Sequence, residues 1–171
     1  SIKKAEQIRK KIGLPKDAWF TCVHVRDGGY YEKNSDYREG IAKRLRNSNI
    51  EKYSRALKLI TESGGWVVRL GNSSMKPLNK MEKVIDYPFT EFKSDLMDIY
   101  FLKECLFFLG PQSGIADVAI MFQKPSIFID HFSEIIIPPP HQGDLCIYKH
   151  VYSLVENRRL KLSELMNEFE K

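Results

Sequence analysis

The sequence is poor in the residues that mark several classes of protein. Its 171 residues include only three cysteines and four histidines. Cys22, Cys105 and Cys146 have neither the spacing of a metal site nor that of a disulfide framework. No apolar run approaches the roughly 20 residues that a membrane-spanning helix needs, and the charged first segment is unlike a signal peptide. We therefore expect no membrane span and a reducing compartment, the cytoplasm.

Charge and length narrow the possibilities further. Lys and Arg total 27 against 22 Asp and Glu, a net charge of +5, which suits an anionic ligand. A dense basic stripe, which a nucleic-acid-binding domain would need, is missing, so we expect no nucleic-acid partner. The basic cluster is interpreted as a solvated surface: Arg38, Lys43, Arg44 and Arg46. Residues 1–171 are long enough for one domain. Because the chain begins at Ser1 rather than at a methionine, the interpretation that it is a fragment of a longer protein stays open.

Apolar and β-branched runs alternate with segments of helical periodicity along most of the chain. Strands are predicted at 19–25, 66–71, 84–87, 106–109 and 126–129. Helices are predicted at 5–12, 50–63, 94–104, 115–122 and 163–170, with Asn49 as the cap of the second. Alternation of this kind predicts an α/β fold, a Rossmann-like parallel sheet flanked by helices on both faces.

Polar residues follow three of these strands, at the edge where parallel sheets bind ligands. They are His24, Arg26 and Asp27 after the first strand, Arg69 and Gly71 at the second, and Gln112, Ser113 and Gly114 after the fourth. Arginine matches phosphate oxygens, and a helix amino terminus offers unpaired N–H groups with a favourable dipole. We expect the two arginines, the hydroxyl and the helix start to converge as a diphosphate site.

Structural alternatives stand beside these assignments. His24 could be a buried histidine of the core, although its period-two spacing from Arg26 favours a ligand role. Arg69 is equally compatible with an ion pair to Asp86 or Asp95. The segment 110–114 could be only a tight turn, and Asp95 near a helix start is interpreted as a dipole or capping partner.

Metal binding is not predicted. The remaining histidines and nearby acids show no recognisable metal spacing: His131, His141, His150, Asp130 and Asp144. We therefore expect no metal held by the protein.

The triplet His24-Val25-Arg26 resembles the H-x-R motif of O-fucosyltransferase-like enzymes. Residues 94–122 are similar to the later motif of α1,6-fucosyltransferases and of the related rhizobial Nod-factor enzymes. The ordered set HVR, RNxxIExY, GGWVVRxGxxSMKPL, SDxMD and GxxSG is similar to a bacterial family of predicted glycosyltransferases, known mostly from surface-polysaccharide regions. The resemblance covers residues 18–165.

This resemblance implies the C-terminal, donor-binding half of a two-domain GT-B glycosyltransferase, with a second lobe or partner subunit across the cleft. Arg26 would bind the donor β-phosphate and stabilise the leaving diphosphate, Ser113 and nearby backbone would hold phosphate oxygens, and Asp86 could read the base. The implied donor is a nucleoside diphosphate sugar such as a GDP-sugar, with no cofactor. The implied acceptor is a glycan or another hydroxyl.

The chain departs from the fucosyltransferase pattern at one position. The family has an acidic residue three positions after its arginine, where this chain has Gly29, and the acid here is Asp27. Asp27 and Tyr31 are therefore our candidates for activating or orienting the acceptor. Two other functions stay open, a nucleotide-sugar epimerase or hydrolase of GT-B-like architecture and a non-catalytic nucleotide-sugar-binding module.

Overall fold

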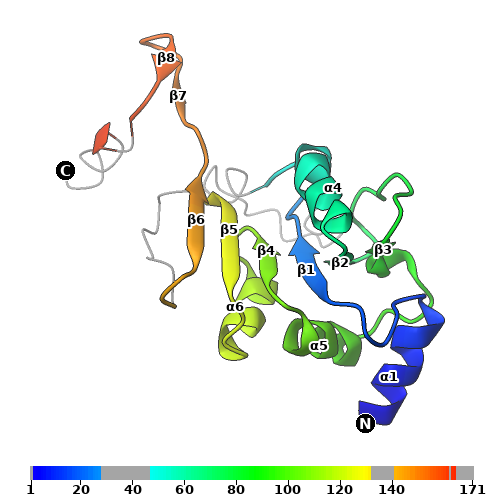
Figure 1. The fold of residues 1–171 in the computed structure, drawn as a ribbon. Coiled ribbons are helices and arrows are strands. Elements are labelled where there is room, and N and C mark those ends of the chain that lie inside the picture. The colour runs from blue at the N-terminus through cyan, green and yellow to red at the C-terminus, as the bar shows by residue number, and fades with distance from the viewer. Residues whose placement is uncertain (1, 28–46, 132–140, 162, 165–171) are drawn as a thin grey trace.

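A six-stranded, all-parallel sheet forms the centre of the computed structural model (Figure 1). The structure describes residues 2–27, 47–131, 141–161 and 163–164. The strands are β1 (Phe20–His24), β2 (Trp66–Leu70), β3 (Val84–Asp86), β4 (Phe108–Gly110), β5 (Ser126–His131) and β6 (Leu145–Tyr148). Their order in the sheet is β3-β2-β1-β4-β5-β6, the order of dinucleotide-binding Rossmann folds.

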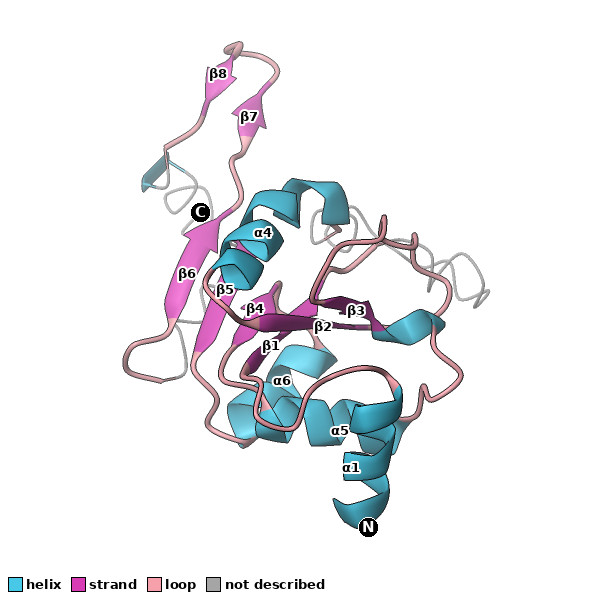
Figure 2. Cartoon of the chain, turned by 45° about the vertical axis from the view of Figure 1, so that its right-hand side comes forward, coloured by secondary structure: helices cyan, strands magenta, loops and turns pink. Residues whose placement is uncertain are grey.

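Helices cover both faces of the sheet, as Figure 2 shows. They are α1 (Ile2–Lys11), α4 (Ser54–Glu62), α5 (Asp95–Glu104) and α6 (Gly114–Met121), with short 3-10 helices η1 (Ile50–Tyr53) and η2 (Tyr87–Phe89). Helix α4 lies on one face, and α1, α5 and α6 lie on the other. The predicted Rossmann-like α/β fold is therefore confirmed.

Alternation along the strands sends their side chains to two separate cores. Val23, Val25 and Val67 pack with Leu57 and Ile60 of α4. The intervening positions of the same strands belong to the other core, beneath α1, α5 and α6: Cys22, Val68 and Leu70. Because successive side chains of a strand point to opposite faces, His24 lies on the α5 and α6 side of the sheet, and Arg69 lies on the α4 side.

Two predicted boundaries differ from those in the structure, at the start of the second helix and at the start of the fourth strand. The helix predicted from Ile50 begins as the 3-10 turn η1, and the Asn49 side chain caps it by accepting a bond from the Glu51 N–H at 3.0 Å. The fourth strand begins at Phe108 rather than Leu106. Even so, Leu106 N donates to Phe20 O at 2.8 Å, so the chain is already aligned with the sheet there.

The prediction for the end of the chain is wrong in part. Strand β6 and the hairpin of β7 (Tyr152–Ser153) and β8 (Arg158–Arg159) lie where no strand is expected from the sequence. The strand is a run of only four apolar or aromatic residues, too short to identify a strand by pattern alone, and Leu145 and Ile147 are each more than half exposed. Of the helix predicted at 163–170, Ser163 and Glu164 are helical, and the rest lies outside the described residues.

Among the residues that the structure describes, no helix is both long enough and apolar enough to cross a membrane.

Candidate functional site

The carboxyl ends of β1 and β4 meet where the strand order reverses. Strands β1 to β3 extend one way from this point and β4 to β6 the other, and the helices that follow β1 and β4 lie on opposite faces. Open α/β sheets bind ligands in the crevice outside the strands at such a switch point. The structure thus brings His24–Asp27 beside residues 110–114.

Gly110 allows β1 and β4 to approach closely. A Cβ atom at this position would lie 2.4 Å from the backbone oxygen of His24, closer than real Cβ contacts. The glycine is therefore required here by contact with the neighbouring strand rather than by a left-handed backbone. It fixes the end of the H-x-R strand directly against the turn that leads into α6.

His24 is 8% exposed, and its Nδ1 lies 3.2 Å from the carbonyl oxygen of Leu70. Because a carbonyl only accepts, the bond requires the proton on Nδ1, which leaves Nε2 as an acceptor. Burial lowers the pKa of His24 to about 4, although the Leu70 bond opposes the shift. The ring is therefore neutral at pH 7 and suits a hydroxyl donor better than a phosphate oxygen.

Helix α6 begins where the sequence predicts the helix start of the diphosphate site. Ser113 caps this helix by accepting a bond from Ala116 N at 3.3 Å. Gln112 and Ser113 are partly exposed, Gly114 is exposed, and a Cβ at Gly114 would meet nothing within 4 Å. The first turn of the helix can therefore be approached from outside, where its unpaired N–H groups and dipole favour a negative charge.

Arg26 and Asp27 lie at the sheet edge and face opposite ways. Val25 packs in the α4 core, and Asp27 lines a cavity on that same side together with Val25. Arg26, between them, therefore points toward the α6 side, which it shares with His24. Its carbonyl accepts from Ser48 N at 2.8 Å, and the Asp27 carboxylate accepts from Lys76 N at 3.2 Å.

Arg69 forms the ion pair that is one of its two predicted alternatives. Its side chain is 1% exposed, and Nη1 lies 3.1 Å from Asp86 Oδ1 and 2.8 Å from the carbonyl oxygen of Lys76. Asp86 also accepts from Leu78 N at 2.8 Å. The pair thus ties the loop after β2 to the end of β3. Removing one partner of such a buried pair is strongly destabilising.

The sequence predicts that both arginines bind one diphosphate, but the structure does not bring them together. Arg69 lies on the α4 side, and Arg26 points to the other. Substrate roles for Arg69 and Asp86 stay predictions, whereas their pairing is observed. Gly71 has a structural requirement of its own, because its φ is +147° and a Cβ atom there would lie only 2.1 Å from Met75 Sδ.

A polar cluster at the ends of β5 and β6 is not predicted from the sequence. The Tyr53 hydroxyl donates to Asp130 at 3.1 Å, and Lys149 Nζ donates to the carbonyl oxygen of Asn47 at 2.6 Å. Asp130 has φ +54°, a left-handed conformation that is uncommon for aspartate. Burial and the nearby Asp130 raise the pKa of Tyr53. The signal that the sequence does contain is an acid directly after the residues predicted as a strand, 126–129.

The acidic residues of α5 have ordinary structural roles, and two predicted features lie outside the described residues. Asp98 pairs with Lys93, yet burial is the larger influence and raises the pKa of Asp98. Asp95 opens α5. No group of three or more potential metal ligands occurs within the described part of the chain. Tyr31 and the basic cluster lie outside the described residues.

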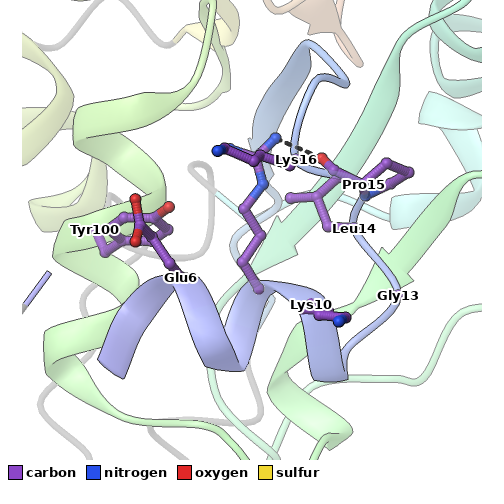
Figure 3. Close-up of a pocket in the computed structure, with 8 residues that line it drawn as sticks. Glu6, Lys10, Gly13, Leu14, Pro15, Lys16 and Tyr100 are labelled. Atoms are coloured by element: carbon purple, nitrogen blue, oxygen red, sulfur yellow. Dashed lines mark hydrogen bonds between the residues drawn. The ribbon is translucent and has the colours of Figure 1, made fainter. Parts of the chain in front are cut away.

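A cavity of about 520 Å³ lies between α1 and α5 and is shown in Figure 3. Glu6, Lys10 and Tyr100 line it, with the loop 13–16 that leads into the amino end of β1. Arg9 spans this loop by donating to the carbonyl oxygens of Pro15 and Ala18. Because ligands of open α/β sheets bind at the carboxyl ends, we favour the β1 and β4 crevice over this cavity.

Comparison of the chain with protein-family models, with curated proteins and with solved structures finds no match.

Proposed function

We propose that this domain binds a nucleoside diphosphate sugar and transfers the sugar to a hydroxyl of an acceptor, as the donor-binding half of a GT-B-type glycosyltransferase. The observation that supports this most is the strand order, which sets His24–Asp27 against the amino terminus of α6. A diphosphate between them would meet a guanidinium on one side and helix N–H groups on the other.

The proposed reaction needs charge stabilisation at the leaving group. The acceptor oxygen attacks the anomeric carbon of the donor, the bond from that carbon to the diphosphate oxygen breaks, and the diphosphate departs with both bonding electrons. Arg26 and the α6 dipole would stabilise the charge that develops there, and fixed groups of this kind contribute several kcal/mol in enzymes. The acceptor proton would pass to a base, for which Asp27 is our candidate.

Neighbouring residues take distinct roles in this proposal. The acceptor nitrogen of His24 suits a hydroxyl of the ribose or of the donor sugar. Ser113 and the backbone of residues 112–114 would hold phosphate oxygens. Free thiols at Cys22, Cys105 and Cys146 agree with a reducing compartment such as the cytoplasm. A surface-polysaccharide acceptor follows from the family resemblance alone.

The first prediction concerns Arg26→Ala. We expect this change to weaken nucleotide binding by roughly 10- to 100-fold, because a hydrogen bond to a charged group contributes about 1.5–3 kcal/mol. Calorimetric titration with GDP, UDP, ADP and their sugars measures the loss of affinity and identifies the preferred nucleobase of the donor. Arg55→Ala, on the exposed side of α4, is the matched control and should bind as the unaltered chain does.

Two results would change the proposal. Equal affinity in Arg26→Ala and the unaltered chain would remove the diphosphate site from β1. A second lobe, if there is one, must be present in this assay. Tight binding of a sugar nucleotide that stays intact with every acceptor tested would instead favour a non-catalytic binding module. Inversion of a sugar hydroxyl without transfer would favour the epimerase.

A further inference from the structure

Most of the net positive charge of the chain lies in its first 18 residues. This segment contains six Lys and Arg against two Asp and Glu, a net charge of +4, and the whole chain has +5. The segment forms α1 and the loop that leads into the amino end of β1. Figure 1 shows α1 at one corner of the domain, so the positive charge is concentrated there.

The lysines of α1 share one side of the helix. They are Lys3, Lys4, Lys10 and Lys11, and all four are exposed. Their spacing of i, i+1, i+7 and i+8 places them on one side of a helix with 3.6 residues per turn. On the opposite side, Ala5 is buried and Ile8 packs against the core. The outward face of α1 is thus a stripe of four lysines.

No acid neutralises this stripe within the described residues. None of the four ammonium groups forms an ion pair or a hydrogen bond there, and Lys11 Nζ lies 5.6 Å from the centre of the Phe92 ring. Glu6 is the one acid of α1. It lies on the flank of the helix, where it lines the 520 Å³ cavity together with Tyr100 (Figure 3). The stripe therefore favours a partner that presents several negative charges at once.

Exposed apolar side chains lie beside the lysine stripe. Ile2 is 66% exposed, and Leu96 and Ile99 of α5 are about half exposed. Helices α1 and α5 are in contact on the same face of the sheet. The outward surface of a helix is convex, so it offers no groove for an extended peptide. Lysines with apolar neighbours on such a surface suit an anionic bilayer, because apolar side chains enter the lipid interface while the long lysines reach the headgroups.

We propose that the outward face of α1 binds the anionic surface of a lipid bilayer, with the exposed apolar side chains beside it at the lipid interface. The inference does not depend on the transferase proposal. Residues 13–16 lead from α1 to the amino end of β1, whereas the crevice between β1 and β4 lies at the carboxyl ends. Contact with a bilayer through α1 would therefore occur at the other end of the sheet from the crevice.

The test measures cosedimentation of the chain with sucrose-loaded vesicles at about 0.1 M salt. The vesicles contain phosphatidylcholine alone or with about one third phosphatidylserine, and we expect binding only to the anionic vesicles. A lysine near such a surface contributes about fivefold to partitioning, so Lys3→Gln with Lys10→Gln should bind about 25-fold more weakly. The matched control, Lys52→Gln with Lys58→Gln, removes the same charge from exposed positions of η1 and α4. It should bind as the unaltered chain does.

Three results would overturn the proposal. Absence of binding to the anionic vesicles would exclude a lipid site on α1. Equal losses in the two double variants would mean that net charge, rather than the α1 face, causes binding. Displacement from the vesicles by a short DNA duplex or by polyglutamate, at equal concentration of negative charge, would assign the face to a nucleic acid or to an acidic protein. Circular dichroism of both variants, which change only exposed residues, should show unaltered helix content.

Discussion

Arginines at two neighbouring strand ends have different environments in this domain. Arg69 is almost completely buried and paired with Asp86, whereas Arg26 is only partly buried at the edge. Sequence spacing treats the two alike, because each lies near the carboxyl end of an apolar strand, Arg69 within β2 and Arg26 just after β1. The difference comes from register: Arg69 lies opposite Asp86 in the β2 and β3 pairing, and the strand order cannot be read from a single strand.

The burial of a single residue, His24, leads us to predict that the stability of the protein depends on pH. Its pKa of about 4 in the folded protein is below the ordinary value of 6.5, so the unfolded chain binds the extra proton first. The stabilising contribution is complete above about pH 6.5 and is lost as the pH falls toward 4. We expect a loss of about 3 kcal/mol, measured by urea unfolding across this range.

The matched comparison for this prediction is His24→Asn, which cannot titrate. Its unfolding free energy should lack the part of the pH dependence between 6.5 and 4 that the histidine contributes. Identical pH profiles for the two proteins would show that His24 is not held neutral by burial.

Elements are predicted well where the apolar residues of a strand or helix are bounded by turn or capping residues. Strands β1, β2, β3 and β5 and helices α5 and α6 fall where their apolar patterns place them. Strand β6 is not predicted because its apolar run, Leu145–Tyr148, has only four residues, too few to identify a strand from sequence alone. Its place beside β5 is set by pairing between segments far apart in sequence, which local pattern does not encode.

The contact between β1 and β4 yields a prediction about glycine. Gly110→Ala places a Cβ 2.4 Å from the backbone oxygen of His24, so the two strands must separate. We expect a loss of about 1–3 kcal/mol in stability together with weaker nucleotide binding, because the separated strands form the site. Chemical denaturation and calorimetry measure the two effects.

Gly114→Ala is the control for this change. A Cβ there meets nothing within 4 Å, and alanine is the better helix former. Stability should therefore stay the same or rise slightly. Equal stability losses at both glycines would mean that close approach of the strands is not the cause.

At the scale of the whole molecule, topology decides which polar residues cooperate. The fold class follows from alternation of strands and helices, but the separation of the site into two sides of one edge does not. That separation requires the helix that follows each strand to be placed on a definite face of the sheet. The sequence therefore predicts which polar residues lie at this edge of the sheet, but not on which face each of them lies.

If Arg26 and the α6 dipole stabilise the charge of the leaving diphosphate, donor binding and sugar transfer do not require a divalent cation. Removal of divalent cations should leave donor binding and transfer unchanged within about twofold, since guanidinium and helix dipole supply the positive charge. Calorimetry and a transfer assay with EDTA, compared with added Mg²⁺ or Mn²⁺, measure this. A loss of more than about tenfold with EDTA that Mg²⁺ or Mn²⁺ restores would contradict metal independence.

The central claim is the position of the diphosphate, and amide chemical-shift mapping with GDP or with the nucleotide that binds best tests it most directly. We predict the largest shifts at the backbone N–H groups of residues 112–116 and near Arg26, at the crevice between β1 and β4. Largest shifts around the loop 13–16 and Tyr100, or around Arg69 and Asp86, would place the nucleotide elsewhere and contradict the account.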